Sequence, residues 1–504
     1  MKHKFDSKIT CAVLVLFLIC IFLSFVLDIR ILINFAHDDS FYYIKTANNF
    51  SKGFGSTFDK VNITNGYHPL WFLILSGYFF LLNLIQQFSP EIIFRFVFAL
   101  HIAFSLITYF LLKRIFEILQ TPKISLIIVS FLLIPFILIR DLGMETILSC
   151  VLFLLLVYFK SKELFYHKFF FIPKLVIYVL MSLTRTDYCF SVIPFFIISD
   201  IYFSDYQNKF KYAIKIYGAC LLIYFTNMII NYFNFGNPNI VSSQIVSGFP
   251  SISLLDNIQL LFTPTQRFSQ LPKILILWIS TVIIYFNRNK FDNFGLFLFG
   301  SLIGANIYIL IHLFFNSFGI REWYLALPII ISLILITYML KEISKGHLVF
   351  LATIAFLFAL SITYLTRVQN LKYNSIYAYS KLISKIVPEN ERIFSFDWMG
   401  VIGFFSDRNL ICGDGFINSF EYLGYLRSGD ITNYLKKYKI KYYSTYKTNP
   451  IDSFQDYKKF IDFALKPIIF DNNDIIKKFP YYYGHSSQTV SGTFFLVKFP
   501  FKYF

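Results

Sequence analysis

Charged residues are scarce in this chain. Of its 504 residues, 15% are Asp, Glu, Lys or Arg and 56% are hydrophobic, and the mean hydropathy is +0.59. A soluble domain carries about 25% charged and about 45–50% apolar residues. The composition therefore excludes a single-domain soluble enzyme and a disordered chain, and it indicates a polytopic membrane protein.

Cysteine is rare, and the common catalytic motifs are missing. The chain has six cysteines, and all but Cys412 lie in apolar runs, where a thiol behaves as a small hydrophobe. This distribution excludes a disulfide-stapled secreted module. No Walker loop, GxSxG elbow, HExxH or paired CxxC is present, so ATP-driven transport and zinc or serine hydrolysis lack support.

Positive charge exceeds negative charge. Lys and Arg number 46 and Asp and Glu 29, which gives a net charge of +17. In a soluble protein this excess would suggest nucleic acid, but membrane proteins retain Lys and Arg in their cytoplasmic loops. No compact basic motif accompanies the charge, so we expect no nucleic-acid partner.

Long apolar runs recur between residues 9 and 365. A membrane-spanning helix needs about 20 apolar residues. We expect spans at 9–27, 69–87, 91–112, 122–139, 144–159, 171–184, 187–203, 211–233, 272–287, 293–315, 323–340 and 347–365.

Basic turns orient these spans. They lie at 113–123, 160–168, 209–215, 288–290 and 341–345, and the excess of Lys and Arg in cytoplasmic loops places them inside, together with the N-terminus. Segment 69–112 then has to cross an odd number of times although it looks like two spans, so one of the two is re-entrant or lies along the interface. We expect about 11 crossings, with the C-terminus outside.

The chain changes character near Thr366. Charged residues become frequent there, and apolar runs shorten to strand length at 392–396, 409–412, 440–444 and 493–498, with a helical pattern at 418–438. We therefore predict a polytopic α-helical membrane domain at 1–365 and a small extracytoplasmic α/β domain at 366–504. In the latter, Asp397 and Asp414-Gly415 are typical of turns at strand ends.

Two adjacent acids stand in the first outer loop. Asp38 and Asp39 follow the first span, and desolvating both is costly unless they share a cation or a proton. The pair fits a general base together with a ligand for a divalent metal ion or a phosphate. Alternatively, Asp39 or Ser40 begins a helix running to about Asn49, which would lie flat on the interface. We expect Trp71, at the end of the loop, in the aromatic belt of the membrane.

Further charges flank the spans on the same outer side. Asp141 and Glu145 are functional candidates, since boundary ions usually are, although Glu145 also suits the first turn of a helix. Arg185 either holds a phosphate bidentately or pairs with Asp187 to close a hairpin. Arg321 either anchors a helix at the interface or pairs with a lipid phosphate.

Several of these segments together resemble a known family. Asp38-Asp39, Tyr42-Tyr43, Gly53-Phe-Gly55 and 64–71 (TNGYHPLW) resemble the first outer loop of GT-C glycosyltransferases, in particular bacterial relatives of protein O-mannosyltransferases and lipid A aminoarabinose transferases. Segments 143–146, 183–187, 397–403 and 414–415 resemble later motifs of the same group. The likeness touches most of the chain but is dense only in residues 34–71.

The resemblance implies a GT-C fold and a glycosyltransferase. Such an enzyme moves a sugar from a polyprenyl-phosphate carrier to a glycan, lipid or protein acceptor, at the outer face of a bacterial inner membrane and without a nucleotide cofactor. Asp38 or Asp39 would match the catalytic acid, and Glu145 or Asp141 a second acidic position.

The remaining expected site residues would bind substrates. Arg185 and Arg321 are candidates for the carrier phosphate, and we assign Asn65, His68, Asp141 and Asp187 to substrate binding. Asp39 and Glu145 are the expected ligands if a divalent metal ion takes part.

Two other functions stay open. A transporter or flippase for a lipid-linked or small substrate fits the many spans, although we find no inverted repeat of the kind many transporters show. A membrane scaffold with a partner-binding tail is the third hypothesis.

Overall fold

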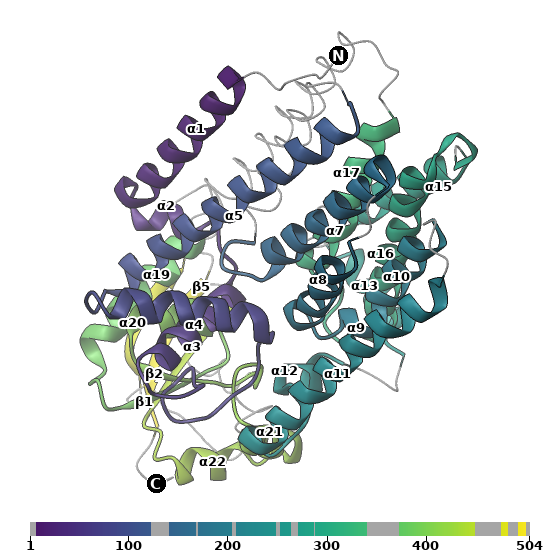
Figure 1. The fold of residues 1–504 in the computed structure, drawn as a ribbon. Coiled ribbons are helices and arrows are strands. Elements are labelled where there is room, and N and C mark those ends of the chain that lie inside the picture. Colours follow the sequence, from purple (N-terminus) through teal and green to yellow (C-terminus); the bar gives the residue numbers. More distant parts are fainter. Residues whose placement is uncertain are drawn as a thin grey trace.

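A computed structural model describes residues 7–121, 141–167, 170–203, 208–247, 252–263, 271–286, 288–339, 372–448, 475–481 and 492–499. The spans expected at 122–139 and 347–365, and the expected domain boundary at 365–366, lie outside these residues. Figure 1 shows a bundle of helices joined at one end to a small α/β domain.

Helices make up the described part of the chain before residue 340. They are α1 (Ser7–Val26), α2 (Ile29–Ile33), α3 (Asp38–Ser51), α4 (Pro69–Asn83), α5 (Pro90–Ile118), α7 (Thr146–Tyr166), α8 (Phe171–Thr184), α9 (Tyr188–Ser191), α10 (Ile193–Tyr202), α11 (Lys209–Phe235), α12 (Val241–Val246), α13 (Leu254–Leu261), α15 (Leu271–Phe286), η2 (Arg288–Lys290), α16 (Asn293–Phe315), η3 (Glu322–Leu325) and α17 (Ala326–Met339).

Three of the described helices, α5, α11 and α16, are long and apolar enough to cross a membrane. Other apolar helices are shorter: α4 has 15 residues and α10 has 10. At 1.5 Å per residue, α4 is about 22 Å long, less than the hydrocarbon core of about 30 Å. The described residues thus fit a helical membrane protein, but they do not confirm about 11 spans.

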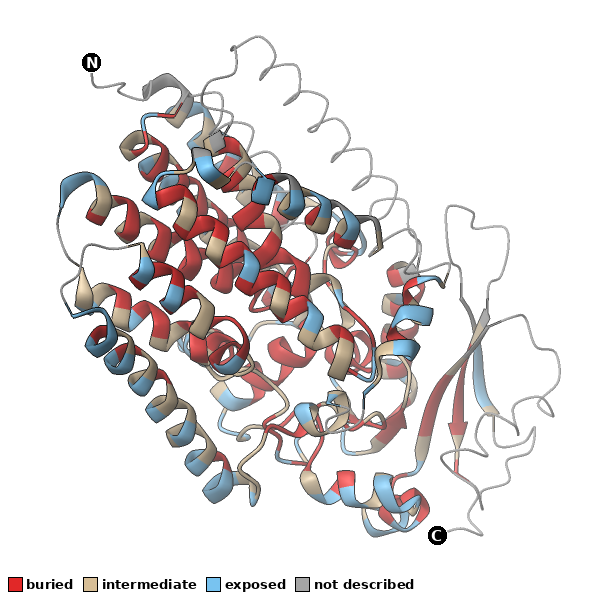
Figure 2. Ribbon diagram, turned by 90° about the vertical axis from the view of Figure 1, so that its right-hand side faces the viewer, coloured by how far each residue is buried: buried red, intermediate tan, exposed pale blue. Residues whose placement is uncertain are grey.

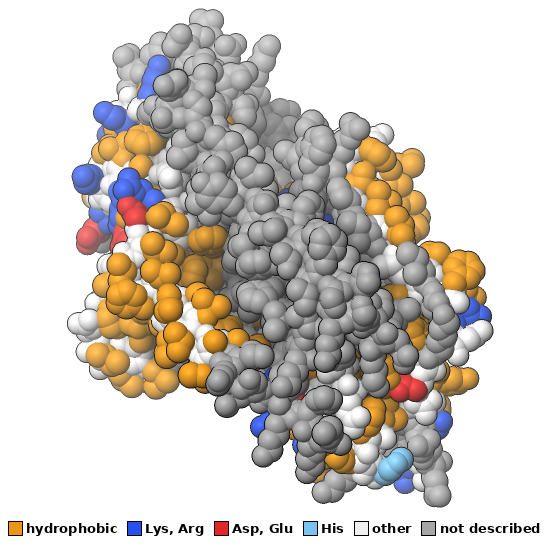
Figure 3. All heavy atoms as spheres, turned by 90° about the horizontal axis from the view of Figure 1, so that it is seen from above, with side chains coloured by type: hydrophobic (Ala, Val, Ile, Leu, Met, Phe, Trp, Pro, Cys, Tyr) orange, Lys and Arg blue, Asp and Glu red, His pale blue; other side chains and the backbone are white. Residues whose placement is uncertain are grey.

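The outside of the bundle is apolar. Large side chains of α11, such as Leu222, Phe225 and Phe233, are more than half exposed, and Figure 2 shows exposed positions along the outer helices around a buried centre. Seen from above, hydrophobic side chains form broad patches on the described surface (Figure 3). Apolar patches of this extent suit contact with lipid rather than with water.

Four buried charged side chains form ion pairs between α7, α8 and α10 inside the bundle. Lys160 of α7 lies 3.0 Å from Asp200 of α10, and Lys174 of α8 lies 2.7 Å from the same carboxylate. Lys174 also pairs with Glu163 of α7. Lys160 was expected in a basic turn, but it lies within α7 and its side chain is fully buried, where Asp200 compensates its charge.

The C-terminal part contains α19 (Lys372–Ile386), β1 (Arg392–Ser395), α20 (Met399–Ser406), β2 (Asn409–Cys412), α21 (Phe420–Ser428), α22 (Ile431–Lys437), β3 (Tyr442–Thr448), β4 (Ile475–Tyr481) and β5 (Gly492–Lys498).

These strands form one mixed sheet in the order β2-β1-β3-β5-β4. β1 pairs in parallel with β2 and β3, and β5 pairs antiparallel with β3 and β4. The four expected strands are confirmed. The expected helix at 418–438 is two helices, because Gly429 takes a φ of +71° and ends α21.

Helix α3 joins the bundle to the α/β domain (Figure 1). The ring of Phe41 lies 5.3 Å from Phe94 of α5, 5.5 Å from Phe404 and 5.3 Å from Phe405 of α20. Residues 40–49 are all buried. The expectation that this helix lies flat on the interface is therefore wrong, because both of its faces are covered by protein.

Candidate active site at the junction of the two domains

Polar side chains from separate segments meet where the bundle joins the α/β domain. His37 Nε2, just before α3, lies 3.2 Å from Asp141 Oδ1. His68 Nε2, just before α4, lies 3.8 Å from Glu145 Oε1. Glu145 in turn accepts a hydrogen bond of 2.5 Å from Arg185 Nη1. The acids, the histidine and the arginine singled out in the sequence thus share one region.

Asp38 is held by the α/β domain. Its Oδ1 accepts a hydrogen bond from Val401 N at 2.8 Å, and its Oδ2 accepts one from Gly400 N at 3.2 Å. The acid therefore sits at the N-terminus of α20, where the backbone N–H groups favour negative charge. A helix was expected to begin in this segment, and α3 begins at Asp38. The Asp38 carboxylate also accepts hydrogen bonds from the first turn of a second helix, more than 350 residues away.

Asp39 is the neighbouring acid, and its carboxylate makes no hydrogen bond or ion pair with any residue that the structure describes. Burial, together with the charge of Asp38, raises the pKa of Asp39 to about 6, against the opposing charge of Arg321. A carboxylate of this kind is a competent base near neutral pH, because it is both ionised and basic there.

Arg321 is exposed, and its charge acts on Asp39, whose pKa it lowers. Within the described part of the chain, its guanidinium has no hydrogen-bond or ion-pair partner. Its segment is fixed by Trp323, whose ring lies edge-on to His37 at 5.4 Å between centroids. A guanidinium that is not paired can bind a phosphate by donating hydrogen bonds to its oxygens.

Arg185 is occupied by two acids. Its Nε donates to Asp187 Oδ1 at 3.2 Å and its Nη2 to Oδ2 at 3.1 Å, while Nη1 bonds Glu145. The guanidinium also lies 5.0 Å from the centroid of the Tyr324 ring. The pairing with Asp187 is the hairpin alternative expected from the sequence, and it leaves less of this guanidinium for a phosphate.

Asp187 contacts two residues that were not expected from the sequence, Tyr308 and His312. Its Oδ2 accepts a hydrogen bond from Tyr308 Oη at 3.1 Å and lies 3.2 Å from His312 Nε2. Both come from α16, whose uniformly apolar pattern hides them. A histidine in a helix that is long and apolar enough to cross a membrane was the available signal, because polar groups at membrane depth are costly and often functional.

His68 has one ring nitrogen near Glu145 and one without a partner among the described residues. Burial, aided by the charge of Arg185, lowers the pKa of His68, so the ring is neutral at physiological pH. Its Nδ1 is buried without a hydrogen-bond partner among the described residues. Its backbone N–H donates to Tyr43 Oη at 3.3 Å, which fixes the residue at the start of α4.

Asn65 lies apart from the acids. Its side chain donates to Asn239 O and accepts from Val241 N, both at 2.9 Å. It therefore joins the loop between α3 and α4 to the start of α12, and the structure does not bring it to the acid cluster.

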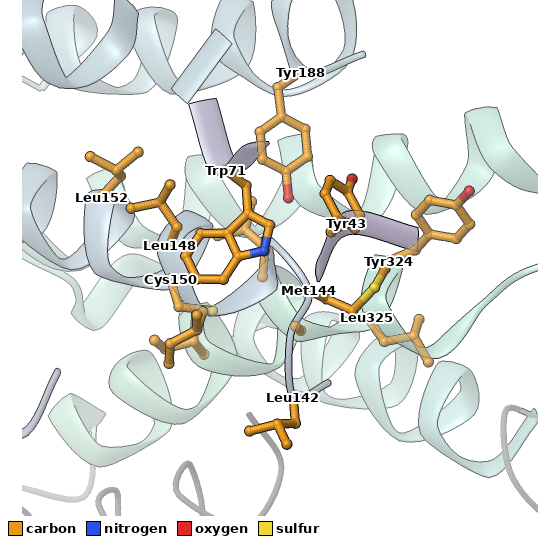
Figure 4. Close-up of a cluster of buried hydrophobic side chains, with 14 of the residues drawn as sticks. Tyr43, Trp71, Leu142, Met144, Leu148, Cys150, Leu152, Tyr188, Tyr324 and Leu325 are labelled. Carbon is orange, nitrogen blue, oxygen red and sulfur yellow. The ribbon is translucent and has the colours of Figure 1, made fainter. Parts of the chain in front are cut away.

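Trp71 packs against the segment that carries Asp141 and Glu145. It is fully buried and its Nε1 donates to Gly143 O at 2.7 Å, so the expectation of an aromatic-belt residue is wrong. Gly143 has a φ of +86°, and a Cβ there would lie 2.8 Å from Ser40 Cβ, so only glycine allows this close approach. Figure 4 shows Trp71 beside this segment, with Tyr43 and Tyr188 close by.

Asp414 reaches the cluster from the α/β domain. It forms the expected turn, with Oδ1 accepting from Phe416 N at 3.0 Å, and its Oδ2 also lies 3.5 Å from Tyr42 Oη. Burial, together with the charges of Asp39 and Asp38, raises the pKa of Asp414 to about 8. Asp397 instead accepts hydrogen bonds from Tyr446 N and Thr445 Oγ1 of β3, which is the structural turn that was expected.

The described residues do not assemble a metal site. No group of three or more His, Cys, Asp or Glu side chains within them is arranged to hold a metal ion. Of the two expected ligands, Glu145 is already bonded to Arg185, whereas a divalent cation such as Mg²⁺ or Ca²⁺ needs about six oxygen ligands.

No protein-family model and no curated protein matches the chain. The likeness to GT-C glycosyltransferases therefore rests on the motifs quoted above, and the function has to be argued from the site.

Proposed function

We propose that the protein is a membrane glycosyltransferase with a GT-C-like architecture, which moves a sugar from a polyprenyl-phosphate carrier to an acceptor at the outer face of the membrane. The observation that carries the proposal is the pair of Asp39 and Arg321. The two side chains have opposite charges and interact electrostatically, and neither has a hydrogen-bond partner among the described residues.

Sugar transfer needs one group of each kind. A base has to take the proton of the acceptor hydroxyl as that oxygen attacks the sugar. The leaving phosphate gains negative charge, which a cation stabilises. Asp39 is the better base of the two neighbouring acids, because the carboxylate of Asp38 is engaged by two backbone N–H groups. Arg321 is the better phosphate ligand of the two arginines, because Arg185 is paired.

The surroundings suit a lipid-borne donor. A polyprenyl chain stays in the bilayer, so its phosphate reaches a protein at the membrane boundary. The apolar outer surface of α11 suits lipid contact. Arg185 forms ion pairs with Glu145 and Asp187. These linked polar side chains can orient the sugar hydroxyls.

Asp39→Asn tests the proposal, because it removes the base and preserves the size of the side chain. Transfer is measured with the purified full chain in proteoliposomes, from radiolabelled polyprenyl-phosphate hexose and pentose donors to a cell-envelope glycan fraction. We expect transfer to fall by roughly 10²- to 10⁴-fold. The matched control is Asp28→Asn, which alters an exposed acid at the start of α2 that pairs with Arg30.

Full transfer by Asp39→Asn would reject the proposal. If instead neither protein forms a covalent product, but both support counterflow of a lipid-linked substrate in liposomes, the protein is a transporter or flippase.

A further inference from the structure

Helix α20 is short, buried and enclosed at both ends. All eight of its residues are buried, and it begins after Trp398 and ends before Asp407, which both take left-handed backbone conformations, with φ of +48° and +51°. The first N–H groups and the last C=O groups of any helix lack partners within that helix. In α20, side chains of α3 supply partners at both ends.

The N-terminal partner is Asp38, as described above. The approach is close enough to require glycine at position 400, since a Cβ there would lie 2.1 Å from the backbone oxygen of Asp38. A negative charge at this end is electrostatically favourable, because the helix dipole is positive there.

The C-terminal partner is Lys45. Its Nζ donates to Gly403 O at 2.6 Å and to Arg408 O at 2.7 Å, and the side chain is buried. A positive charge suits the C-terminal carbonyls of a helix. Lys45 follows Asp38 by seven residues, or about 10.5 Å along α3, which matches the length of α20. The two helices therefore run side by side in the same direction.

Tyr42 completes the contact. Asp38, Tyr42 and Lys45 follow each other at intervals of four and three residues, so they lie on one face of α3. Each of the three contacts the α/β domain: Asp38 and Lys45 at α20, and Tyr42 at Asp414. Asp39 follows Asp38 directly and is therefore turned by about 100° around the helix, so it does not lie on this face.

We infer that Asp38 is a positioning residue, which docks the α/β domain onto α3 and thereby orients Asp39 in the site. The α/β domain is then a structural part of the site rather than an appendage. The docking follows from the contacts alone, whereas the effect on transfer rests on the proposed function.

Substitutions at position 38 separate positioning from chemistry. Asp38→Ala removes the acceptor of the two N–H groups. Asp38→Ser and Asp38→Asn remove the charge but retain an oxygen that can cap a helix. Hydrogen–deuterium exchange of the 399–406 peptide in the full chain measures docking, and the transfer assay measures function.

We expect Asp38→Ala to speed exchange of this peptide by roughly two- to thirtyfold, the range expected of a lost helix cap, and to lower transfer. Asp38→Asn should restore a large part of both, because its amide oxygen takes the place of one carboxylate oxygen, and Asp38→Ser less, because its oxygen is one bond nearer the backbone. Transfer by Asp38→Asn should also remain active to lower pH than in the wild type, because the charge of Asp38 raises the pKa of Asp39. The matched control is Asp28→Ala, which removes the cap of α2 and should leave this exchange unchanged.

Two results would overturn the inference. One is unchanged exchange in Asp38→Ala. The other is an Asp38→Asn protein that exchanges as the wild type does but transfers no sugar, since Asp38 would then act chemically. If Asp39→Asn and Asp38→Ala both transfer fully while exchange rises in the latter, the docking stands and the proposed function fails.

Discussion

Gly400→Ala tests the junction between the domains by adding a single methyl group. The new Cβ would lie 2.1 Å from Asp38 O, whereas ordinary contact needs about 3.4 Å. A shift of about 1.3 Å would stretch the hydrogen bonds of 2.8 and 3.2 Å to Asp38 beyond bonding distance.

The expected cost combines these effects. Overpacking costs about 1–3 kcal/mol, and hydrogen bonds to a charged group contribute about 1.5–3 kcal/mol each. Alanine recovers up to about 1 kcal/mol of helix propensity. We expect a net loss of about 3–8 kcal/mol in the free energy of unfolding, measured by denaturant or thermal unfolding in detergent.

The matched control is Gly424→Ala in α21. A Cβ at Gly424 meets nothing within 4 Å, so this variant should be stabilised by up to about 1 kcal/mol. Equal stability of the two variants would refute the close packing of α20 on α3.

Two further substitutions test the support of the site. Lys174→Met leaves Asp200 and Glu163 buried with less compensating charge, so it should lower the free energy of unfolding by about 3–5 kcal/mol, and an unchanged thermal unfolding midpoint would contradict the network. Trp71→Phe removes the hydrogen bond to Gly143 O; it should cost about 1 kcal/mol in the same assay and lower transfer, and a wild-type transfer rate would show that this anchor does not position the acids.

Composition and short-range spacing predicted the class of the molecule and part of the site. The apolar composition indicated membrane helices, and strand-length runs in the tail fell on β1, β2, β3 and β5. The pairing of Arg185 with Asp187 was accessible as an alternative because the two residues are neighbours in the chain. Such features depend on local sequence alone.

The contacts that the sequence did not predict join distant segments. Nothing near Asp38 indicates that its carboxylate binds Gly400 and Val401. Hydropathy treats Trp71 as a boundary residue, since it does not register that the indole N–H finds a buried carbonyl. The described helices do not confirm the span count, because an apolar run such as that of α4 forms a helix of only 15 residues.

The pH dependence of sugar transfer tests the central claim most directly. With the pKa of Asp39 raised to about 6, the carboxylate is protonated below that pH and available as a base above it. The wild-type rate should therefore rise through about pH 6 to a plateau near neutrality. A rate that is constant from about pH 5 to about pH 8 at saturating donor, or one whose acid limb persists in Asp39→Asn, would contradict the assignment of Asp39 as the base.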